Sequence, residues 1–304
     1  MTGEGADQSV TRTVYDKAGN SSSASKDHIS IDKTDPVATL VSRLPAANGA
    51  GWNNSDVTVT WSCADGLSGA KTSPVSDTRT TEGANQTASG LCEDKAGNTK
   101  PTSLGGINID KTQPVLANVP SDKTVAATSP SGATVGYVNP TATDNLDPSP
   151  ALACAPASGS VFAPGTTTVT CTATDQAGNA KAATFKVTVN FTFNGFLQPV
   201  DNKILNGMKA GSTAPIKWQV PNGSGGYVSD LSIVKTEASG VITCIATSID
   251  ALEEYATGGT SLRYDSTSNQ FIYNWQSPKK PGTCYGVKIT LTDGQSYQAL
   301  FQLN

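Results

Sequence analysis

A repeat of 78 residues constrains this chain more than any other feature of its sequence. Residues 4–37 read EGADQSVTRTVYDKAGNSSSASKDHISIDKTDPV, and residues 82–115 read EGANQTASGLCEDKAGNTKPTSLGGINIDKTQPV. Asp16 aligns with Asp94 and Asp32 with Asp110, which sets the period at 78 residues. A near-identical repeat of this length indicates tandem domains, each forming one β-sandwich.

Strand patterns recur along the chain. In DVTVTWSCAD, Val57, Val59, Trp61 and Cys63 share one face of a strand, and the residues between them are polar. Charged residues make up only 15% of the chain, and Gly and Pro punctuate it, which favours short strands and tight turns. The sequence therefore predicts an all-β chain of tandem immunoglobulin-like β-sandwiches arranged as an elongated rod.

Pro36 and Pro114, which follow the IDKT segments, suit domain junctions because proline cannot donate to a strand ladder. The first unit then keeps only its last two strands, Ser9–Tyr15 and Ser25–Ile31, which cannot form a sandwich alone. Their unpaired edges favour strand addition by a neighbouring copy or an upstream segment at residues 1–35. The predicted domains are a truncated repeat at 1–36, an immunoglobulin-like domain at 37–112, a third domain at 113–190 and a β-sandwich at 191–304.

The six cysteines fall two to each complete domain, which predicts one disulfide in each. Disulfides indicate a location outside the cytosol, secreted or at a cell surface. No signal peptide follows Met1, and because the chain begins inside a repeat we expect the secretion signal upstream. The predicted pairs are Cys63 with Cys92, Cys154 with Cys171, and Cys244 with Cys284.

Residues 113–190 closely resemble the hyalin repeat, or HYR, domain. The resemblance rests on Thr143-Asp144-Asn145, Gly159-Ser160-x-Phe162, Gly165-Thr166 and the run from Cys171 to Asn179. Many members carry a cysteine where this chain has Leu146, so a second disulfide of the family is missing. The resemblance implies an immunoglobulin-like module of extracellular, often adhesive proteins.

The remaining parts resemble modules of bacterial proteins. Residues 191–304 resemble the bacterial domain named for its P-x-K-F motif, which here reads Pro215-Ile216-Lys217-Trp218. Members lie at the C-termini of large secreted bacterial proteins. The first two units resemble bacterial immunoglobulin-like repeats that carry a D-x-A-G-N turn.

Catalytic, nucleic-acid and membrane functions are not expected. The only histidine, His28, stands beside Asp27 in the truncated repeat, and no G-x-S-x-G turn accompanies it. A formal net charge of -4 argues against binding nucleic acid, and no apolar run is long enough to span a bilayer. We therefore expect a protein that is not an enzyme.

Calcium is the one candidate cofactor. D-x-A-G-N occurs three times, further aspartates follow the repeats, and calcium binds several carboxylate and carbonyl oxygens. The alternative is a plain hairpin turn without a metal, which the same residues also explain. The candidate ligands are Asp16, Asn20, Asp32, Asp94, Asn98, Asp110, Asp144, Asp147, Asp175 and Asn179.

A sugar platform is the second candidate site. Phe271, Tyr273 and Trp275 share one strand face, and with Trp218 they offer rings that could stack on glycans. The alternative is that these aromatic rings fill the core of a large domain.

Taken together, the sequence predicts a non-catalytic structural and adhesive module, the stalk and tip of a bacterial surface or secreted protein. Its partner would be a cell-surface glycan or protein receptor. Two other hypotheses stay open: a glycan-binding accessory region of a secreted hydrolase, and an immunoglobulin-like decoration of a virion.

Overall fold

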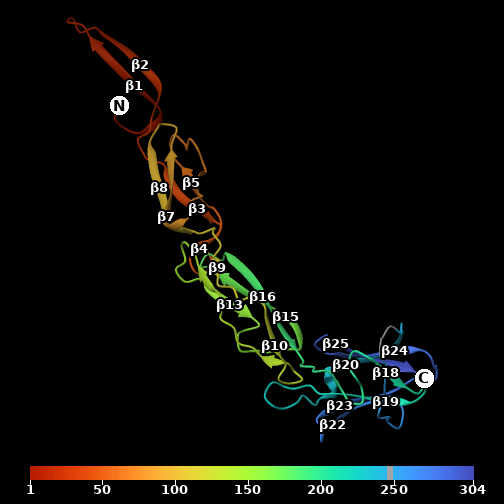
Figure 1. Ribbon diagram of the computed structural model, residues 1–304. Helices are drawn as coiled ribbons and strands as arrows, with labels where there is room; N and C mark the ends of the chain where they lie inside the picture. Colours follow the sequence, from red (N-terminus) through yellow and green to blue (C-terminus); the bar gives the residue numbers. More distant parts are fainter. Residues whose placement is uncertain (245–248) are drawn as a thin grey trace. The chain divides into compact units, whose positions relative to one another are not determined.

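The computed structural model describes residues 1–244 and 249–304, and strands make up nearly all of its regular structure (Figure 1). The predicted all-β fold class is confirmed. Within the described residues the only helical element is the 3-10 turn η1 (Leu231–Ile233), and none of their helices could cross a membrane. The chain divides into two compact units, one of residues 1–115, 142–152 and 173–181, and one of residues 116–141, 153–172 and 182–304.

The N-terminal residues form one antiparallel hairpin of β1 (Gly5–Tyr15) and β2 (Ser21–Ile31). Both strands begin earlier than the sequence pattern predicted. The extra residues of β1 include two irregularities of register, which interrupt the alternation that marks a strand in the sequence. The turn between the strands contains Gly19 at φ 84°, a conformation that suits glycine.

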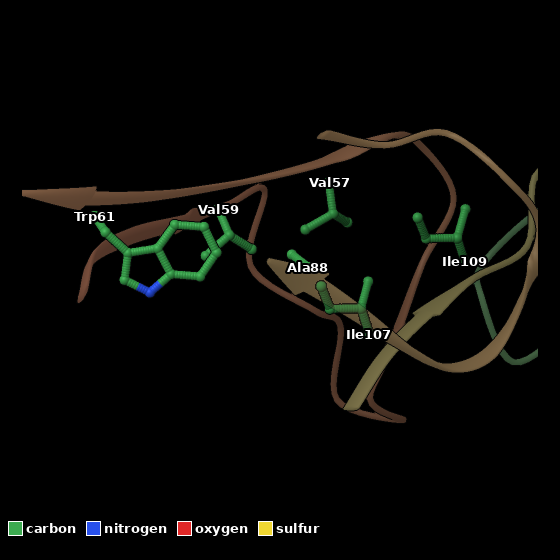
Figure 2. Close-up of a cluster of buried hydrophobic side chains, with 6 residues drawn as sticks. All are labelled: Val57, Val59, Trp61, Ala88, Ile107 and Ile109. Atoms are coloured by element: carbon green, nitrogen blue, oxygen red, sulfur yellow. The ribbon is translucent and has the colours of Figure 1, made fainter. Parts of the chain in front are cut away.

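Residues 37–112 form two three-stranded sheets, in the orders β3-β5-β6 and β4-β8-β7. Figure 2 shows how Val57, Val59 and Trp61 of β5 point toward Ala88 of β7 and the isoleucines of β8. All are buried because alternate residues of each strand face the opposite sheet. The strands are β3 (Val37–Leu44), β4 (Trp52–Asn53), β5 (Val57–Ala64), β6 (Val75–Arg79), β7 (Gly83–Glu93) and β8 (Thr99–Ile109).

Residues 113–190 contain a four-stranded sheet in the order β10-β16-β15-β13 and two short pairs, β11-β14 and β12-β9. Strand β10 runs parallel to β16, and Lys123 lies opposite Val187. The strands are β9 (Val115–Ala117), β10 (Lys123–Ala126), β11 (Ala133–Thr134), β12 (Thr141–Thr143), β13 (Ala151–Ala155), β14 (Val161–Phe162), β15 (Gly165–Thr174) and β16 (Ala180–Asn190).

Residues 191–304 form a four-stranded sheet, β17-β19-β23-β22, and a five-stranded sheet, β20-β24-β25-β18-β21. Strand β23 lies between two partners, and five consecutive residues from Phe271 to Trp275 are buried. The strands are β17 (Phe196–Leu197), β18 (Leu205–Met208), β19 (Thr213–Trp218), β20 (Val234–Ile242), β21 (Ile249–Ala251), β22 (Ser261–Asp265), β23 (Gln270–Gln276), β24 (Cys284–Leu291) and β25 (Ser296–Leu303).

All three predicted disulfides are present. Cys63 of β5 and Cys92 of β7 join the two sheets of residues 37–112, with their Cα atoms 5.5 Å apart. The other two, Cys154–Cys171 and Cys244–Cys284, link neighbouring strands or their ends within one sheet. The first bridge therefore holds a sandwich closed, whereas the other two reinforce pairings that hydrogen bonds already make.

Candidate metal centres

The three D-x-A-G-N segments close in the same way. In the turn at Asp94, Asn98 donates from its backbone N to Oδ1 at 2.8 Å and from its Nδ2 to Oδ2 at 2.7 Å. The turns at Asp16 and Asp175 repeat both hydrogen bonds. The aspartate therefore organises the turn through these hydrogen bonds, which is the role that the alternative of a plain hairpin turn gives it.

The predicted ligand role of the turn asparagines is not supported. Nδ2 of Asn98 also donates to the carbonyl oxygen of Asp32, and Nδ2 of Asn179 donates to the carbonyl oxygen of Asp110 at 2.9 Å. An amide placed between a carboxylate and a carbonyl must present its NH₂ group, because only nitrogen can donate. Asn98 and Asn179 thus hold a residue near the end of one repeat against a turn of the next.

Two clusters of three aspartates arise around these turns. Asp32, Asp65 and Asp94 form the first centre, in which carboxylate oxygens all lie within 4.8 Å of one another. Asp110, Asp144 and Asp175 form the second centre, whose carboxylate oxygens also lie within 4.8 Å of one another. Each centre takes one aspartate from the IDKT segment after a closing strand, β2 or β8, and one from a D-x-A-G-N turn.

The middle aspartate of each centre follows a strand directly. Asp65 comes after β5, and Asp144 comes after β12. Sequence reasoning named Asp144 but missed Asp65. The available signal for Asp65 is its position directly after a strand of alternating apolar and polar residues and before a glycine. An ordinary turn has the same sequence pattern, so this signal does not single out a metal ligand.

The second centre is the more deeply buried. Asp110 is 2% exposed and Asp175 is 6% exposed. Oδ2 of Asp144 is buried and has no hydrogen-bond partner among the described residues. The hydrogen bond given to the Asp110 carboxylate comes from the backbone N of Thr112, at 3.1 Å. Asp175 and Oδ1 of Asp144 do accept hydrogen bonds, so the charge without a donor among the described residues is concentrated on Oδ2 of Asp144 and on the Asp110 carboxylate.

The pKa of Asp110 reflects this charge. Burial, followed by the charges of Asp144 and Asp175, raises the pKa of Asp110 to about 6, against a hydrogen bond from Thr112 that lowers it. In the described chain, no lysine or arginine forms an ion pair with any of the three carboxylates. Two unit charges within 4.8 Å repel by about 3 kcal/mol at an effective dielectric constant of about 20.

In the first centre, backbone N atoms donate more hydrogen bonds to the carboxylates than they do in the second. Oδ1 of Asp65 accepts hydrogen bonds from the backbone N atoms of residues 67, 68 and 69. Hydrogen bonds led by the one from Gly69 lower the pKa of Asp65. Asp94 is fully buried, whereas Asp32 and Asp65 are partly exposed. Burial raises the pKa of Asp94, but hydrogen bonds led by those from Asn98 outweigh it and lower this pKa, so Asp65 and Asp94 both favour the charged form that binds a cation.

Two predicted ligands lie outside both centres. Asp16 is exposed and belongs to no group of three acidic residues within the described part of the chain. Asp147 is buried, but its carboxylate accepts from the backbone N atoms of Ser149 and Gln176, so it fixes the start of a turn. Neither residue belongs to a group of three acidic side chains among the described residues, so a ligand role for these two stays an untested prediction.

A third acidic group differs from both centres. Asp201, Asp250 and Glu253 also come within 4.8 Å of one another, but all three side chains are at least partly exposed. A hydrogen bond from Asp201 raises the pKa of Asp250. An exposed carboxylate pair of this kind can share a proton or stay hydrated, and it needs no cation.

The predicted sugar platform is wrong. Phe271 and Trp218 are fully buried, Trp275 is 3% exposed and Tyr273 is 8% exposed. Trp218 stacks on Phe271 with ring centroids 5.4 Å apart, and Trp275 contacts Phe301 at 5.0 Å. The rings fill the core because both faces of β23 are covered, whereas the prediction assumed one solvent-exposed face.

His28 takes part in an exposed contact of the N-terminal hairpin. Its Nδ1 lies 2.5 Å from Oδ1 of Asp7, and both side chains are more than two thirds exposed. Water screens such a pair, so it is worth little to stability.

Residues 109–189 match the family model described as the HYR domain, which confirms the resemblance given for residues 113–190. The matched residues include all three aspartates of the second centre. No curated protein matches the chain.

Several solved structures are similar to the chain over most of its length. PcdhgB3 EC1-4 is 7% identical over 97% of this chain and 64% of that chain, with a TM-score of 0.21. The ectodomain of human desmocollin-1 is 12% identical over 81% of this chain and 52% of that chain, and the insect immune protein hemolin is 13% identical over 99% and 73%, both with TM-scores of 0.21. The chain thus spans less than two thirds of the first and about half of the second.

Proposed function

We propose that this chain is a non-catalytic, extracellular adhesion-type module whose two aspartate centres bind calcium. The bound cation would join the end of one repeat to two loops of the next. The observation that carries the proposal is the second centre, where two of three aspartates are buried, carboxylate oxygens lie within 4.8 Å of one another, and Oδ2 of Asp144 has no donor among the described residues. Such a group requires a proton or a cation.

The donor set favours calcium over other metals. Each centre offers carboxylate oxygens alone, without the histidine or thiolate ligands that zinc and copper prefer. Calcium accepts six to eight oxygens in flexible geometry, so carboxylates from three separate loops suit it better than the stricter magnesium. The same cluster of three aspartates recurs at both IDKT segments. This repetition supports a role in cation binding in addition to the role of each aspartate in its turn.

The extracellular location is supported by the three disulfides and by the HYR match. We further propose that the protein is a stalk and tip at a bacterial surface, with the P-x-K-F-like domain at residues 191–304. The domain boundaries at residues 36, 112 and 190 belong to the same proposal. A cell-surface glycan or protein would be its receptor.

Calorimetry of the full chain in calcium and in a chelator tests whether calcium binds and stabilises the fold. Extracellular calcium modules bind with Kd of about 0.1–1 mM, so about 10 mM calcium should stabilise each occupied centre by about 1–3 kcal/mol. For a repeat of this size that shifts Tm by about 5–20 °C. Identical melting curves at pH 7.5 in calcium and in EDTA would contradict the proposal.

A matched control variant exists within the chain. Asp16→Asn changes the same motif at an exposed turn outside both centres, so it should keep the whole calcium shift. Asp94→Asn and Asp175→Asn together should remove it. If Asp16→Asn removes the shift as well, calcium acts on the turns and the assignment to the centres is wrong.

A further inference from the structure

Lys217 of β19 and Asn274 of β23 lie on the same face of the sheet β17-β19-β23-β22, the face turned away from the core. In the antiparallel pair of these strands, Pro215 lies opposite Asn274, and Lys217 lies opposite Ile272. Trp275 and the residues that alternate with it face the core instead. Lys217 and Asn274 are therefore diagonal neighbours, separated by about 7–8 Å between Cα atoms, which a long side chain can span.

Asn274 is buried without a hydrogen-bond donor for its amide oxygen. Its side chain belongs to a residue that is 5% exposed, and Oδ1 has no partner among the described residues. Taking an amide oxygen out of water without a donor is unfavourable, so a native protein rarely leaves one in this state. The carbonyl group of this side chain is thus open to a group that comes from the same face.

Lys217, the lysine of the P-x-K-F-like motif, is held largely away from water beside a carboxylate. Its side chain is 18% exposed, and its Nζ lies 2.6 Å from Oε2 of Glu254. A carboxylate at hydrogen-bond distance can take a proton from an ammonium group and act as a general base. The Glu254 side chain is 58% exposed, so it can also exchange that proton with solvent.

Backbone contacts hold the segment around Glu254 against this part of the domain. The backbone N of Leu252 donates to the carbonyl oxygen of Gly207 at 2.8 Å, and the backbone N of Ala256 donates to the carbonyl oxygen of Thr213 at 2.9 Å. Oγ1 of Thr213 donates in turn to the carbonyl oxygen of Gly258 at 2.8 Å. The segment is therefore fixed on both sides of Glu254, which places the carboxylate beside Lys217.

We propose that Lys217 and Asn274 become joined by an amide bond that the folded chain forms by itself. Glu254 takes one proton from the Nζ ammonium group, which leaves an amine with a free electron pair. Nζ then forms a bond to Cγ of Asn274, and the bond from Cγ to Nδ2 breaks. Nδ2 leaves as ammonia with a second proton from Nζ, and the proton on Glu254 passes to this ammonia, so the carboxylate is restored. The step needs no oxidant and no cofactor.

The product is a covalent link between β19 and β23. Unlike the disulfide Cys244–Cys284 of the same domain, an amide bond is not broken by reducing agents. A link of this kind would keep the two strands paired even when the disulfide is lost. It is independent of the two metal centres, so calcium and EDTA should leave it unchanged.

Intact-mass spectrometry of the full chain, denatured and reduced, tests the bond directly. We expect a mass lower than that of the sequence by one molecule of ammonia. Because a succinimide at an Asn-Gly step loses ammonia as well, a tryptic map must locate the change. We expect no cleavage after Lys217 and one branched peptide that contains Lys217 and Asn274. A wild-type chain with the full mass of its sequence, or an ammonia loss that maps elsewhere, would overturn the proposal.

Three variants separate the roles. Lys217→Arg keeps a positive charge beside Glu254 but lacks the amine, so it should have the full mass of its sequence. Glu254→Gln should form the link about a hundredfold more slowly or not at all, because the base is missing. Lys235→Arg, at an exposed position of β20, is the matched control and should keep the ammonia loss. An ammonia loss that persists in Lys217→Arg would contradict the assignment, and the wild-type mass decides the question even where a variant does not fold.

Discussion

Replacing Asp110 by asparagine should change stability in opposite directions with and without calcium. In EDTA the folded chain holds a buried carboxylate against two others, and this raises the pKa of Asp110 from 3.8 to about 6. A raised pKa in an acid means that the folded state binds its proton more tightly than the unfolded state does. The charged form at pH 7.5 is therefore destabilising, and stability at this centre rises as pH falls from about 6 toward 4.

The size of the effect follows from the shift. Each pKa unit corresponds to about 1.4 kcal/mol, so ionised Asp110 costs the folded state about 3 kcal/mol. Asparagine removes the charge and keeps an oxygen that can accept from the backbone N of Thr112. In EDTA at pH 7.5, Asp110→Asn should therefore stabilise this part of the chain by up to about 3 kcal/mol. In about 10 mM calcium the same variant loses a ligand and should be less stable than the wild type.

Hydrogen exchange read by mass spectrometry measures this locally. Peptides that contain residues 109–112 and 175–179 should exchange up to about a hundredfold more slowly in Asp110→Asn than in the wild type in EDTA, because about 1.4 kcal/mol is a factor of ten. In calcium the order should reverse. Faster exchange in the variant under both conditions would refute the reasoning, since it would mean that the charged carboxylate stabilises the fold without a cation.

Three further predictions concern the framework. Trp275→Ala, at a 3% exposed core position, should destabilise residues 191–304 by about 3–5 kcal/mol in urea denaturation, and a fully stable variant would mean that the ring is not part of the core. Gly132→Ala places a Cβ 1.8 Å from the carbonyl oxygen of Phe162 at φ +113°, so calorimetry should show a loss of about 2–3 kcal/mol or more; an unchanged Tm would refute that contact. Replacing Cys63 and Cys92 by alanine should cost about 3–4 kcal/mol in urea denaturation, and a smaller loss than for Cys154 with Cys171, which close a shorter loop, would contradict the loop-length argument.

Much of the fold could be predicted from particular residues. The match of Asp16 with Asp94 and of Asp32 with Asp110 revealed the repeat, and alternation from Val57 to Cys63 marked a strand with one buried face. Two cysteines in each complete domain were enough to predict the pairs. These features are local or repeat along the chain, so the sequence displays them directly.

The metal centres were predicted only in part. The IDKT aspartates and the D-x-A-G-N turns appear in the sequence, but Asp65 joins them only because three loops meet in space. The asparagines of the same turns donate hydrogen bonds through Nδ2, which the sequence could not predict, since which end of an amide faces a carboxylate depends on the surrounding carbonyl groups.

By itself the sequence determined the repeat, the strands, the turns and the disulfide pairs, because these depend on periodicity and on residue types close together in the chain. Only the tertiary structure decided which carboxylates gather and which rings are buried. Alternating apolar and polar residues show that one face of a strand is buried. They do not show whether another layer of the protein also covers the opposite face. That is why Phe271, Tyr273 and Trp275 are core residues, whereas Val14 of the N-terminal hairpin stays exposed.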